Sequence, residues 1–235
     1  MSKPLLIIGN KNYSSWSLRP WLALRAGGIE FDEKLVPLFA DDWAERKAEL
    51  PSGTVPVLEH DGLVMWETLA ILEYAAETWP DAKLWPSDVK ARAMARVVSS
   101  EMHAGFTAVR SNMPMNIRSS DPGRGRGHDD AAKAAVKRDI HRIEQVWCDC
   151  RETYGASGDF LFGAFTNADA MFAPVVSRFT TYGVALNPTA QAYMDAVQNL
   201  PAMIEWSNAG RAEPWTIKED EIDFVEGVWK DEAPA

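Results

Sequence analysis

Short apolar runs alternate with amphipathic segments along the first 80 residues of the chain. An apolar run that ends at Gly9 and a hairpin signal centred on Asp61-Gly62 are typical of β-strands. The predicted strands are residues 5–8, 31–36, 55–58 and 63–65. Apolar side chains at helical spacing predict helices over residues 17–26 and 67–78, and a polar run of good helix formers closed by Pro51 predicts a helix over residues 41–50.

The order strand–helix–strand–helix–strand–strand–helix predicts an α/β, thioredoxin-like domain with a mixed sheet over residues 1–80. Two tryptophan–proline steps then form a linker, because the residue before proline disfavours helix. An all-α domain is predicted over residues 88–235, with an acidic last stretch, 213–235, expected to lie across the surface. Its predicted helices are 88–118 with a bend near Met113-Pro114, 131–152, 166–182, 189–199 and 201–211.

Composition narrows the classes of partner and compartment. The formal net charge is -10, and a phosphate backbone requires a basic face, so no nucleic-acid partner is expected. The first apolar run is too short for a signal peptide or a membrane span, so no membrane association is expected. Cys148 and Cys150 are interpreted as reduced thiols rather than a disulfide or metal ligands. These features favour a cytoplasmic location and predict no metal site.

The first candidate site follows the first strand. The segment Tyr13-Ser14-Ser15-Trp16-Ser17 opens a predicted helix, where a serine hydroxyl can accept from free N–H groups of the first turn. The positive end of the helix dipole and free hydroxyls can also stabilise an anion, and a thiolate is such an anion.

Two further loops fit the rest of a peptide thiol. A cis bond before Pro56 would leave the backbone of Val55 free to pair with an extended peptide. Thr68 at a helix start offers a hydroxyl and an N–H to a carboxylate, while Glu67 offers a carboxylate to an ammonium. The three loops would meet at one edge of the sheet, and together they match the parts of glutathione.

These motifs resemble those of the glutathione S-transferase superfamily over nearly the full length of the chain. The segment Ser14 to Arg19 is similar to the Ser-Ser-Cys-Ser-x-Arg segment of the zeta class, with Trp16 in place of cysteine. The segment Thr54 to Leu58 and the pair Glu67-Thr68 also match superfamily motifs, and Thr166 to Asp169 is a capping box that opens a helix. The resemblance implies the glutathione S-transferase fold, an α/β thioredoxin-like domain followed by an all-α helical bundle.

The resemblance implies a glutathione transferase that activates the thiolate of glutathione for attack on a small electrophile. Ser14 takes the position of the catalytic hydroxyl, and Ser15 is the second candidate, with its hydroxyl expected to turn towards the helix. The implied glutathione-binding residues are Ser14, Thr54, Val55, Pro56, Glu67 and Thr68. The predicted second-substrate pocket combines Trp16, Met102, Phe106, Arg110 and Met113. The stripe from Met102 to Met113 is equally compatible with a buried core.

Two alternatives remain open on the sequence. One is a glutathione-dependent cis–trans isomerase of the maleylacetoacetate type, although Thr181 occupies the place of the zeta-class arginine that meets the substrate carboxylate, with Arg178 one turn earlier. The other is a non-catalytic interaction module with the same fold. The resemblance also implies a homodimer in which the α/β domain of each subunit contacts the helical domain of its partner.

Overall fold

The computed structural model describes residues 2–125 and 127–221, apart from the side chain of Glu219. In the N-terminal part, the strands are β1 (Leu5–Ile8), β2 (Asp32–Leu35), β3 (Val57–His60) and β4 (Leu63–Trp66), and the helices are α1 (Ser15–Ala26), α2 (Trp43–Glu49) and α3 (Thr68–Thr78). The strand order is β2-β1-β3-β4. Because β1 is parallel to β2 and antiparallel to β3, the predicted mixed sheet is confirmed.

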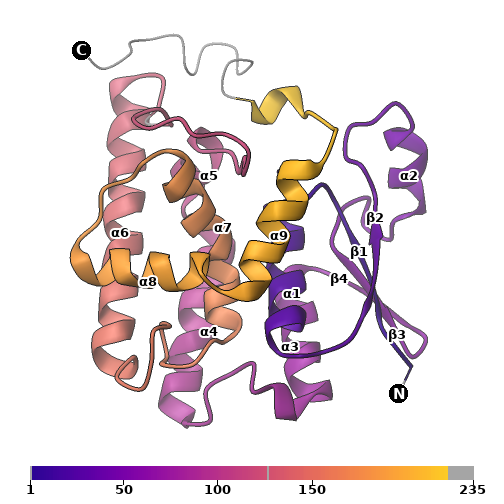
Figure 1. Ribbon diagram of the computed structural model, residues 1–235, viewed down its shortest axis with the longest axis horizontal. Helices are drawn as coiled ribbons and strands as arrows, with labels where there is room; N and C mark the ends of the chain where they lie inside the picture. Colours follow the sequence, from indigo (N-terminus) through magenta and orange to yellow (C-terminus); the bar gives the residue numbers. More distant parts are fainter. Residues whose placement is uncertain (1, 126, 222–235) are drawn as a thin grey trace.

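Strand β1 is buried on both faces of the sheet. Leu6 and Ile8 belong to the large hydrophobic core, whereas Ile7 joins a small cluster with Val36, Leu50 and Val57. Helices α1 and α3 lie between the sheet and the helical part, and α2 lies on the outer side (Figure 1). The end of β1, which leads into α1, is therefore enclosed from both sides.

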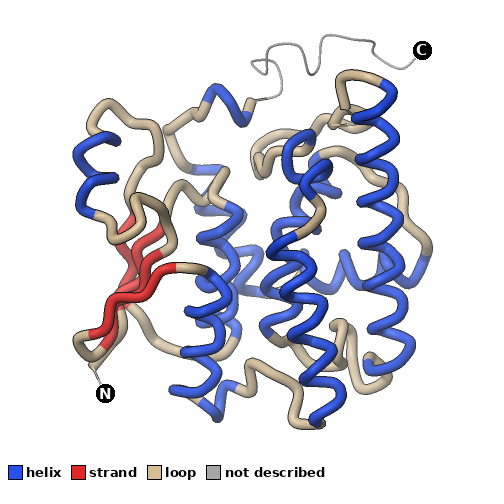
Figure 2. Tube along the Cα trace, turned by 180° about the vertical axis from the view of Figure 1, so that it is seen from behind, coloured by secondary structure: helices blue, strands red, loops and turns tan. Residues whose placement is uncertain are grey.

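The C-terminal part is helical, as Figure 2 shows from behind. Its elements are η1 (Pro80–Ala82), α4 (Val89–Ala104), α5 (Thr107–Asn112), α6 (Asp130–Tyr154), α7 (Asn167–Thr181), α8 (Pro188–Gln198), α9 (Pro201–Ala212) and η2 (Lys218–Asp220). Every residue of α7 except Thr180 is buried, and α7 packs against α1, α4 and α8. Helix α7 is therefore the central element of the helical part.

The predicted interruption near Met113-Pro114 is present, because α5 ends at Asn112 and residues 113–118 are not helical. A further break, which the sequence pattern did not indicate, lies between α4 and α5, at Gly105 and Phe106. Phe106 has a φ of 56°, in the left-handed region, and a Cβ on Gly105 would lie 2.7 Å from the carbonyl oxygen of Glu101. The chain turns here because glycine permits a close approach that any other residue would obstruct.

Several sequence predictions are confirmed. The Val55–Pro56 peptide bond is cis, and Thr166 and Asp169 form the reciprocal capping box at the start of α7. Burial raises the pKa of Asp169 to about 6, while the N–H groups of Leu161 and Thr166 that donate to its carboxylate oppose that shift. The Cys148 and Cys150 thiols are both free.

One continuous hydrophobic core includes residues from Leu6 in β1 to Trp206 in α9. The division of the chain into a domain over residues 1–80 and a domain over residues 88–235 therefore stays a prediction. Of the predicted C-terminal stretch, residues 213–221 lie against the turn that precedes α1, and the remainder, with Phe224 and Trp229, lies outside the described residues. Among the described helices, none has the length and apolar character needed to cross a bilayer. Over the same residues, no cluster of three or more His, Cys, Asp or Glu side chains could hold a metal ion.

Candidate active site

Ser14 is the N-cap of α1 and connects the end of β1 to the first helical turn. Its Oγ accepts from the Ser17 N–H at 3.4 Å and donates to Ser17 Oγ at 2.8 Å. Ser17 Oγ also accepts from the N–H of Gly9, the residue after β1, at 3.0 Å. Ser14 and Ser17 are both buried, so these bonds fix the position of the turn that begins the helix.

The expected orientations of the two serines are reversed. Ser14, and not Ser15, turns its hydroxyl towards the helix. Ser14 is the N-cap residue, and a side chain at that position can accept from the N–H of the third helical residue, which here is Ser17. Ser15 begins the helix, is half-buried, and among the described residues its hydroxyl has no hydrogen-bond partner.

Arg19 brings a positive charge to the same turn. It is fully buried, donates through Nη1 to the Ser15 carbonyl at 2.9 Å, and donates through Nε to the Met171 carbonyl of α7 at 3.0 Å. Arg178 of α7 and Arg110 of α5 lie near enough to act on it electrostatically. Burial, followed by these two guanidinium groups, holds the pKa of Arg19 well below its ordinary value.

The three arginines form a cationic cluster without a bonded carboxylate among the described residues. Arg178 donates to the carbonyls of Met113 and Pro174, and Arg110 donates to backbone carbonyls at the break between α4 and α5. Burial lowers the pKa of Arg178 to about 10, with Tyr182 opposing that shift and Arg110 adding to it. An anion near the first turn of α1 would therefore reduce an electrostatic cost that the fold already carries.

Trp16 occupies the position of the zeta-class cysteine and lies inside this cluster. The Arg19 guanidinium is 4.3 Å from the centroid of its ring and the Arg110 guanidinium is 5.1 Å away. The His103 ring meets it edge-on at 5.2 Å. Cations over the face of an indole ring are favourable, so Trp16 partly compensates the crowded positive charge.

Glu67 and Thr68 lie beside the same turn. Thr68 Oγ1 donates to the Trp16 carbonyl at 3.2 Å and the residue is buried. Glu67, the N-cap of α3, has a φ of 77°, a conformation that non-glycine residues adopt rarely and that is found most often at functional sites. Its exposed carboxylate lies 3.7 Å from His103 Nε2. The third predicted motif is therefore in direct contact with the first.

The segment Thr54-Val55-Pro56 approaches the turn from the other side. A Cβ on Gly9 would lie 3.1 Å from Val55 Cγ2, so Val55 packs against the residue that ends β1. Thr54 is exposed and its hydroxyl lies 2.7 Å from that of Ser52. All three motifs predicted to bind glutathione thus surround the start of α1.

The predicted second-substrate stripe is divided by the fold. Met102, Phe106 and Met113 are buried in the large core, which favours the buried-core alternative for these three side chains. Apolar residues at helical spacing have packed into the interior, which the sequence allowed as the equal alternative. Trp16 and Arg110 are only half-buried and remain able to face a ligand.

The C-terminal segment (residues 213–221) contacts the active-site turn in a way that the sequence pattern did not predict. The buried Glu213 carboxylate accepts from the N–H groups of Lys11 and Asn12, at 2.7 and 3.1 Å. Arg118 donates to the carbonyls of Glu213 and Trp215 and to the Tyr13 hydroxyl, which also bonds Glu221. These partners are between 95 and 208 residues apart in the chain, so no local motif indicates them.

Comparison with known proteins agrees with this architecture. Residues 13–78 match the family model for the glutathione S-transferase N-terminal domain. A Caenorhabditis elegans protein named "Probable maleylacetoacetate isomerase" is 27% identical over 86% of this chain and 92% of its own. The fold is shared with a Burkholderia glutathione transferase homologue solved with bound glutathione, at a TM-score of 0.67, 21% identity, and 90% and 100% coverage.

A bacterial maleyl pyruvate isomerase of the zeta class also has this fold, at a TM-score of 0.66 and 22% identity, with 91% of this chain and 100% of that chain covered. The sheet, the helical part and the turn at Ser14 together define a protein of the glutathione S-transferase fold. The chain therefore has the glutathione S-transferase fold, carries a match to the glutathione S-transferase N-terminal domain over residues 13–78, and is similar in sequence to a protein named as a maleylacetoacetate isomerase.

Proposed function

We propose that the chain is a glutathione-dependent enzyme that activates the glutathione thiol at the start of α1 for attack on a small electrophile. The observation that carries the proposal is the convergence of three motifs on one helix N-terminus. The Ser14 cap, the Thr68 bond to the Trp16 carbonyl and the packing of Val55 on Gly9 all meet there.

The residues around this turn fit each part of glutathione. The serine hydroxyls and the first turn of α1 suit the sulfur, and the backbone at Val55-Pro56 suits the peptide. Glu67 and the start of α3 suit the γ-glutamyl ammonium and carboxylate, because a carboxylate attracts the cation and a helix N-terminus attracts the anion. The Burkholderia homologue that shares this fold was solved with bound glutathione, which supports glutathione as the ligand.

Ser14 is the proposed donor to the sulfur. Its capping role uses an acceptor lone pair, so its proton remains available, and in the described structure that proton is directed at Ser17 Oγ. A bond to a thiolate is charge-assisted and roughly twice as strong as a bond between neutral hydroxyls. The hydroxyl proton therefore turns from Ser17 to the sulfur when the thiolate is present.

Activation requires a modest free energy, which the turn can supply. Lowering a thiol pKa from about 8.5 by roughly two units needs about 2.7 kcal/mol of preference for the thiolate. Three contributions favour the thiolate over the thiol: one charge-assisted hydrogen bond, the dipole of α1 and the positive charge of the buried Arg19 guanidinium. The thiol proton leaves to solvent, and the sulfur electron pair forms the new bond to the carbon of the electrophile. At that carbon a bond breaks at the same time: either a leaving group departs with its electron pair, or the π-bond pair moves to the neighbouring atom and is protonated from solvent.

A second candidate function is glutathione-dependent isomerisation of the maleylacetoacetate type. It is favoured by the isomerase names of two similar proteins and by the cationic cluster of Arg19, Arg110 and Arg178, which suits an acidic substrate. In that reaction the sulfur adds to a double bond and leaves after rotation, so glutathione is not consumed. Thr181 donates to the Asn116 carbonyl and offers no charge to a carboxylate. The concentration of free glutathione after turnover distinguishes the two reactions, because conjugation lowers it and isomerisation leaves it unchanged.

A homodimer is proposed from an exposed apolar surface on the edge strand β4 and on α4. Three side chains of β4 and three of α4 are exposed although apolar: Leu63, Val64, Trp66, Val89, Met94 and Val97. An exposed apolar edge strand favours association, and a second copy of the chain would cover it.

The free thiols of Cys148 and Cys150 support the proposed cytoplasmic location.

The roles of the two serines are tested by Ser14→Ala with Ser15→Ala as the matched control. We expect Ser14→Ala to bind glutathione nearly as well as the original chain, to lose activity near neutral pH and to recover part of it in alkali. The thiol pKa would then have returned towards its free value. Loss of the cap should also lower the free energy of unfolding by about 0.5–2 kcal/mol. pH profiles of kcat/KM and denaturant unfolding measure both effects.

Ser15→Ala should change the pH profile less and leave stability nearly constant. If Ser15→Ala is the inactive variant instead, the roles of the two serines are exchanged. If neither variant changes the profile, backbone N–H groups activate the thiol and the serine assignment is wrong. A chain that binds glutathione but conjugates or isomerises nothing would support the interaction-module alternative.

The γ-glutamyl site is tested by comparing Thr68→Ala with Thr68→Ser. We expect the Thr68 proton to turn from the Trp16 carbonyl to the γ-glutamyl carboxylate when glutathione binds. Removing the hydroxyl should then raise the Kd for glutathione by about 5- to 150-fold, since a lost charged hydrogen bond costs about 1–3 kcal/mol. Thr68→Ser retains the hydroxyl and should stay close to the original Kd in isothermal titration calorimetry. Equal Kd values for the two variants would mean that the γ-glutamyl carboxylate binds elsewhere.

The dimer is tested by light scattering at micromolar concentration. We expect a mass of twice the 26.1 kDa chain, and a single-chain mass for the double variant Trp66→Asp, Val97→Asp, because two charges in the apolar surface oppose association. The single variant Phe39→Asp, at an exposed aromatic outside β4 and α4, is the control and should remain dimeric. A single-chain mass for the original protein would refute the proposal.

A further inference from the structure

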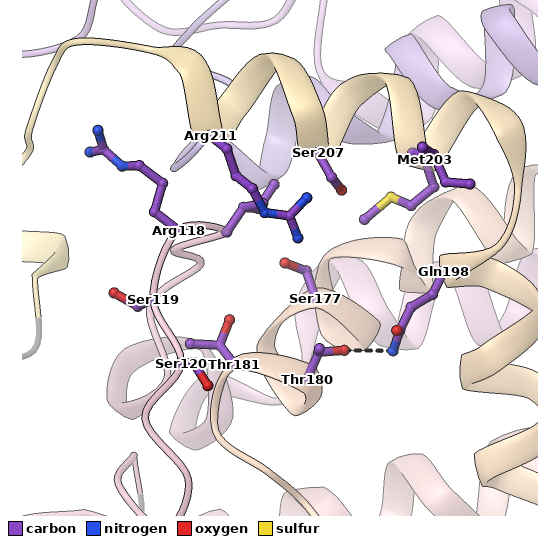
Figure 3. A pocket seen from close by; sticks show the side chains of 12 residues that line it. Arg118, Ser119, Ser120, Ser177, Thr180, Thr181, Gln198, Met203, Ser207 and Arg211 are labelled. Carbon is purple, nitrogen blue, oxygen red and sulfur yellow. Dashed lines mark hydrogen bonds between the residues drawn. The ribbon is translucent and has the colours of Figure 1, made fainter.

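A cavity of about 420 Å³ lies between α7, α9 and residues 117–120, and none of the residues proposed to bind glutathione lines it (Figure 3). Its volume is within the range of small-molecule sites. The lining is unusually rich in hydroxyl groups, which come from Ser119, Ser120, Ser177, Thr180, Thr181 and Ser207. A pocket of this size and polarity is suited to a small polar ligand.

The hydroxyls of the lining threonines are already bonded within the protein, and that of Ser177 is not. Thr180 Oγ1 donates to the Val176 carbonyl and accepts from Gln198 Nε2, and Thr181 Oγ1 donates to the Asn116 carbonyl. Ser177 is only 7% exposed, yet its hydroxyl has no hydrogen-bond partner among the described residues. A helical serine commonly bonds the carbonyl four residues back. Ser177 instead points into the cavity.

Arg211, in the last turn of α9, directs its guanidinium towards the same space as Ser177 (Figure 3). Its one hydrogen bond is to Asn208 Oδ1 at 3.5 Å, and it forms no ion pair with any residue that the structure describes. A guanidinium group has five N–H donors, so most of the donors of Arg211 remain available to a ligand.

The remaining charge in the lining has the same sign. Arg118 turns its guanidinium away, to the Tyr13 hydroxyl and the C-terminal segment, but contributes positive charge at the rim. The lining contains no carboxylate within the described part of the chain. In a chain with a net charge of -10, a pocket lined by two arginines and by hydroxyls is electrostatically selective for an anion.

We propose that this cavity is a binding site for the oxyanion group, carboxylate or phosphate, of a small polar molecule. Arg211 holds the oxyanion through its planar pair of N–H donors, which match carboxylate and phosphate equally. Ser177 donates to the same group from the floor, and Ser207, beside Arg211 on α9, is placed for a further oxygen of the ligand.

The site is tested on the full chain saturated with glutathione, so that the proposed active site is already filled. Inorganic phosphate and succinate are the two probes, each titrated by calorimetry and by the shift in Tm. We expect saturable binding of at least one probe, with a rise in Tm of about 3–6 °C at ten times its Kd. Succinate alone would identify a carboxylate site, and phosphate alone a phosphate site.

Arg211→Gln should weaken that binding at least tenfold, and Ser177→Ala should weaken it by a smaller factor. Arg138→Gln is the matched control, because Arg138 is exposed on α6 and its loss removes the same charge away from the cavity. The absence of saturable binding, or equal weakening by Arg211→Gln and Arg138→Gln, would overturn the proposal. Ser14→Ala should bind the probe unchanged, so a failure of the thiol-activation proposal would leave this result intact.

Discussion

Arg19 joins the active-site turn to the centre of the helical part. One side of its buried guanidinium donates to the Ser15 carbonyl in the first turn of α1, and the other donates to the Met171 carbonyl in α7. Breaking either bond would leave a buried, charged N–H donor without an acceptor, which costs more free energy than the loss of a hydrogen bond between neutral groups. The position of Ser14, Ser15 and Trp16 relative to α7 therefore depends on this one side chain.

The same bonds concentrate positive charge where the proposed chemistry needs it. Arg19, Arg110 and Arg178 direct their hydrogen bonds to backbone carbonyls, so their charges are not neutralised by bonded carboxylates among the described residues. The Trp16 ring lies within 5.1 Å of two of these guanidinium groups. Arg118 and Arg211 provide a second cationic region at the hydroxyl-lined cavity. In an acidic protein both regions favour small anions over polyanions, which the overall charge repels.

Much of the fold could be predicted from the sequence because its signals are local. The Asp61-Gly62 turn between β3 and β4 and the capping box from Thr166 to Asp169 each depend on residues a few positions apart. The end of α5 before Pro114 has a local signal in the proline, whereas the additional break at Gly105 depends on the close approach of Gly105 to the Glu101 carbonyl, which the sequence pattern does not reveal. The choice between core and pocket for Met102 and Met113 depends on packing that periodicity alone does not reveal.

The site was predictable as a set of motifs but not in its bonding. Which serine caps α1 depends on where the helix begins, and a shift of one residue exchanges Ser14 and Ser15. The bonds from Glu213 and Arg118 to the turn join distant parts of the chain, so only the tertiary structure reveals them.

If the start of α1 stabilises a thiolate, the pKa of the glutathione thiol must be lower in the complex with the protein than in free solution. The thiolate absorbs in the ultraviolet where the thiol does not, so a pH titration of the complex against the free protein gives this pKa without any electrophile. We expect a thiol pKa about two units below the free value of about 8.5. A bound thiol that titrates at its free pKa would contradict the account, whatever the affinity for glutathione.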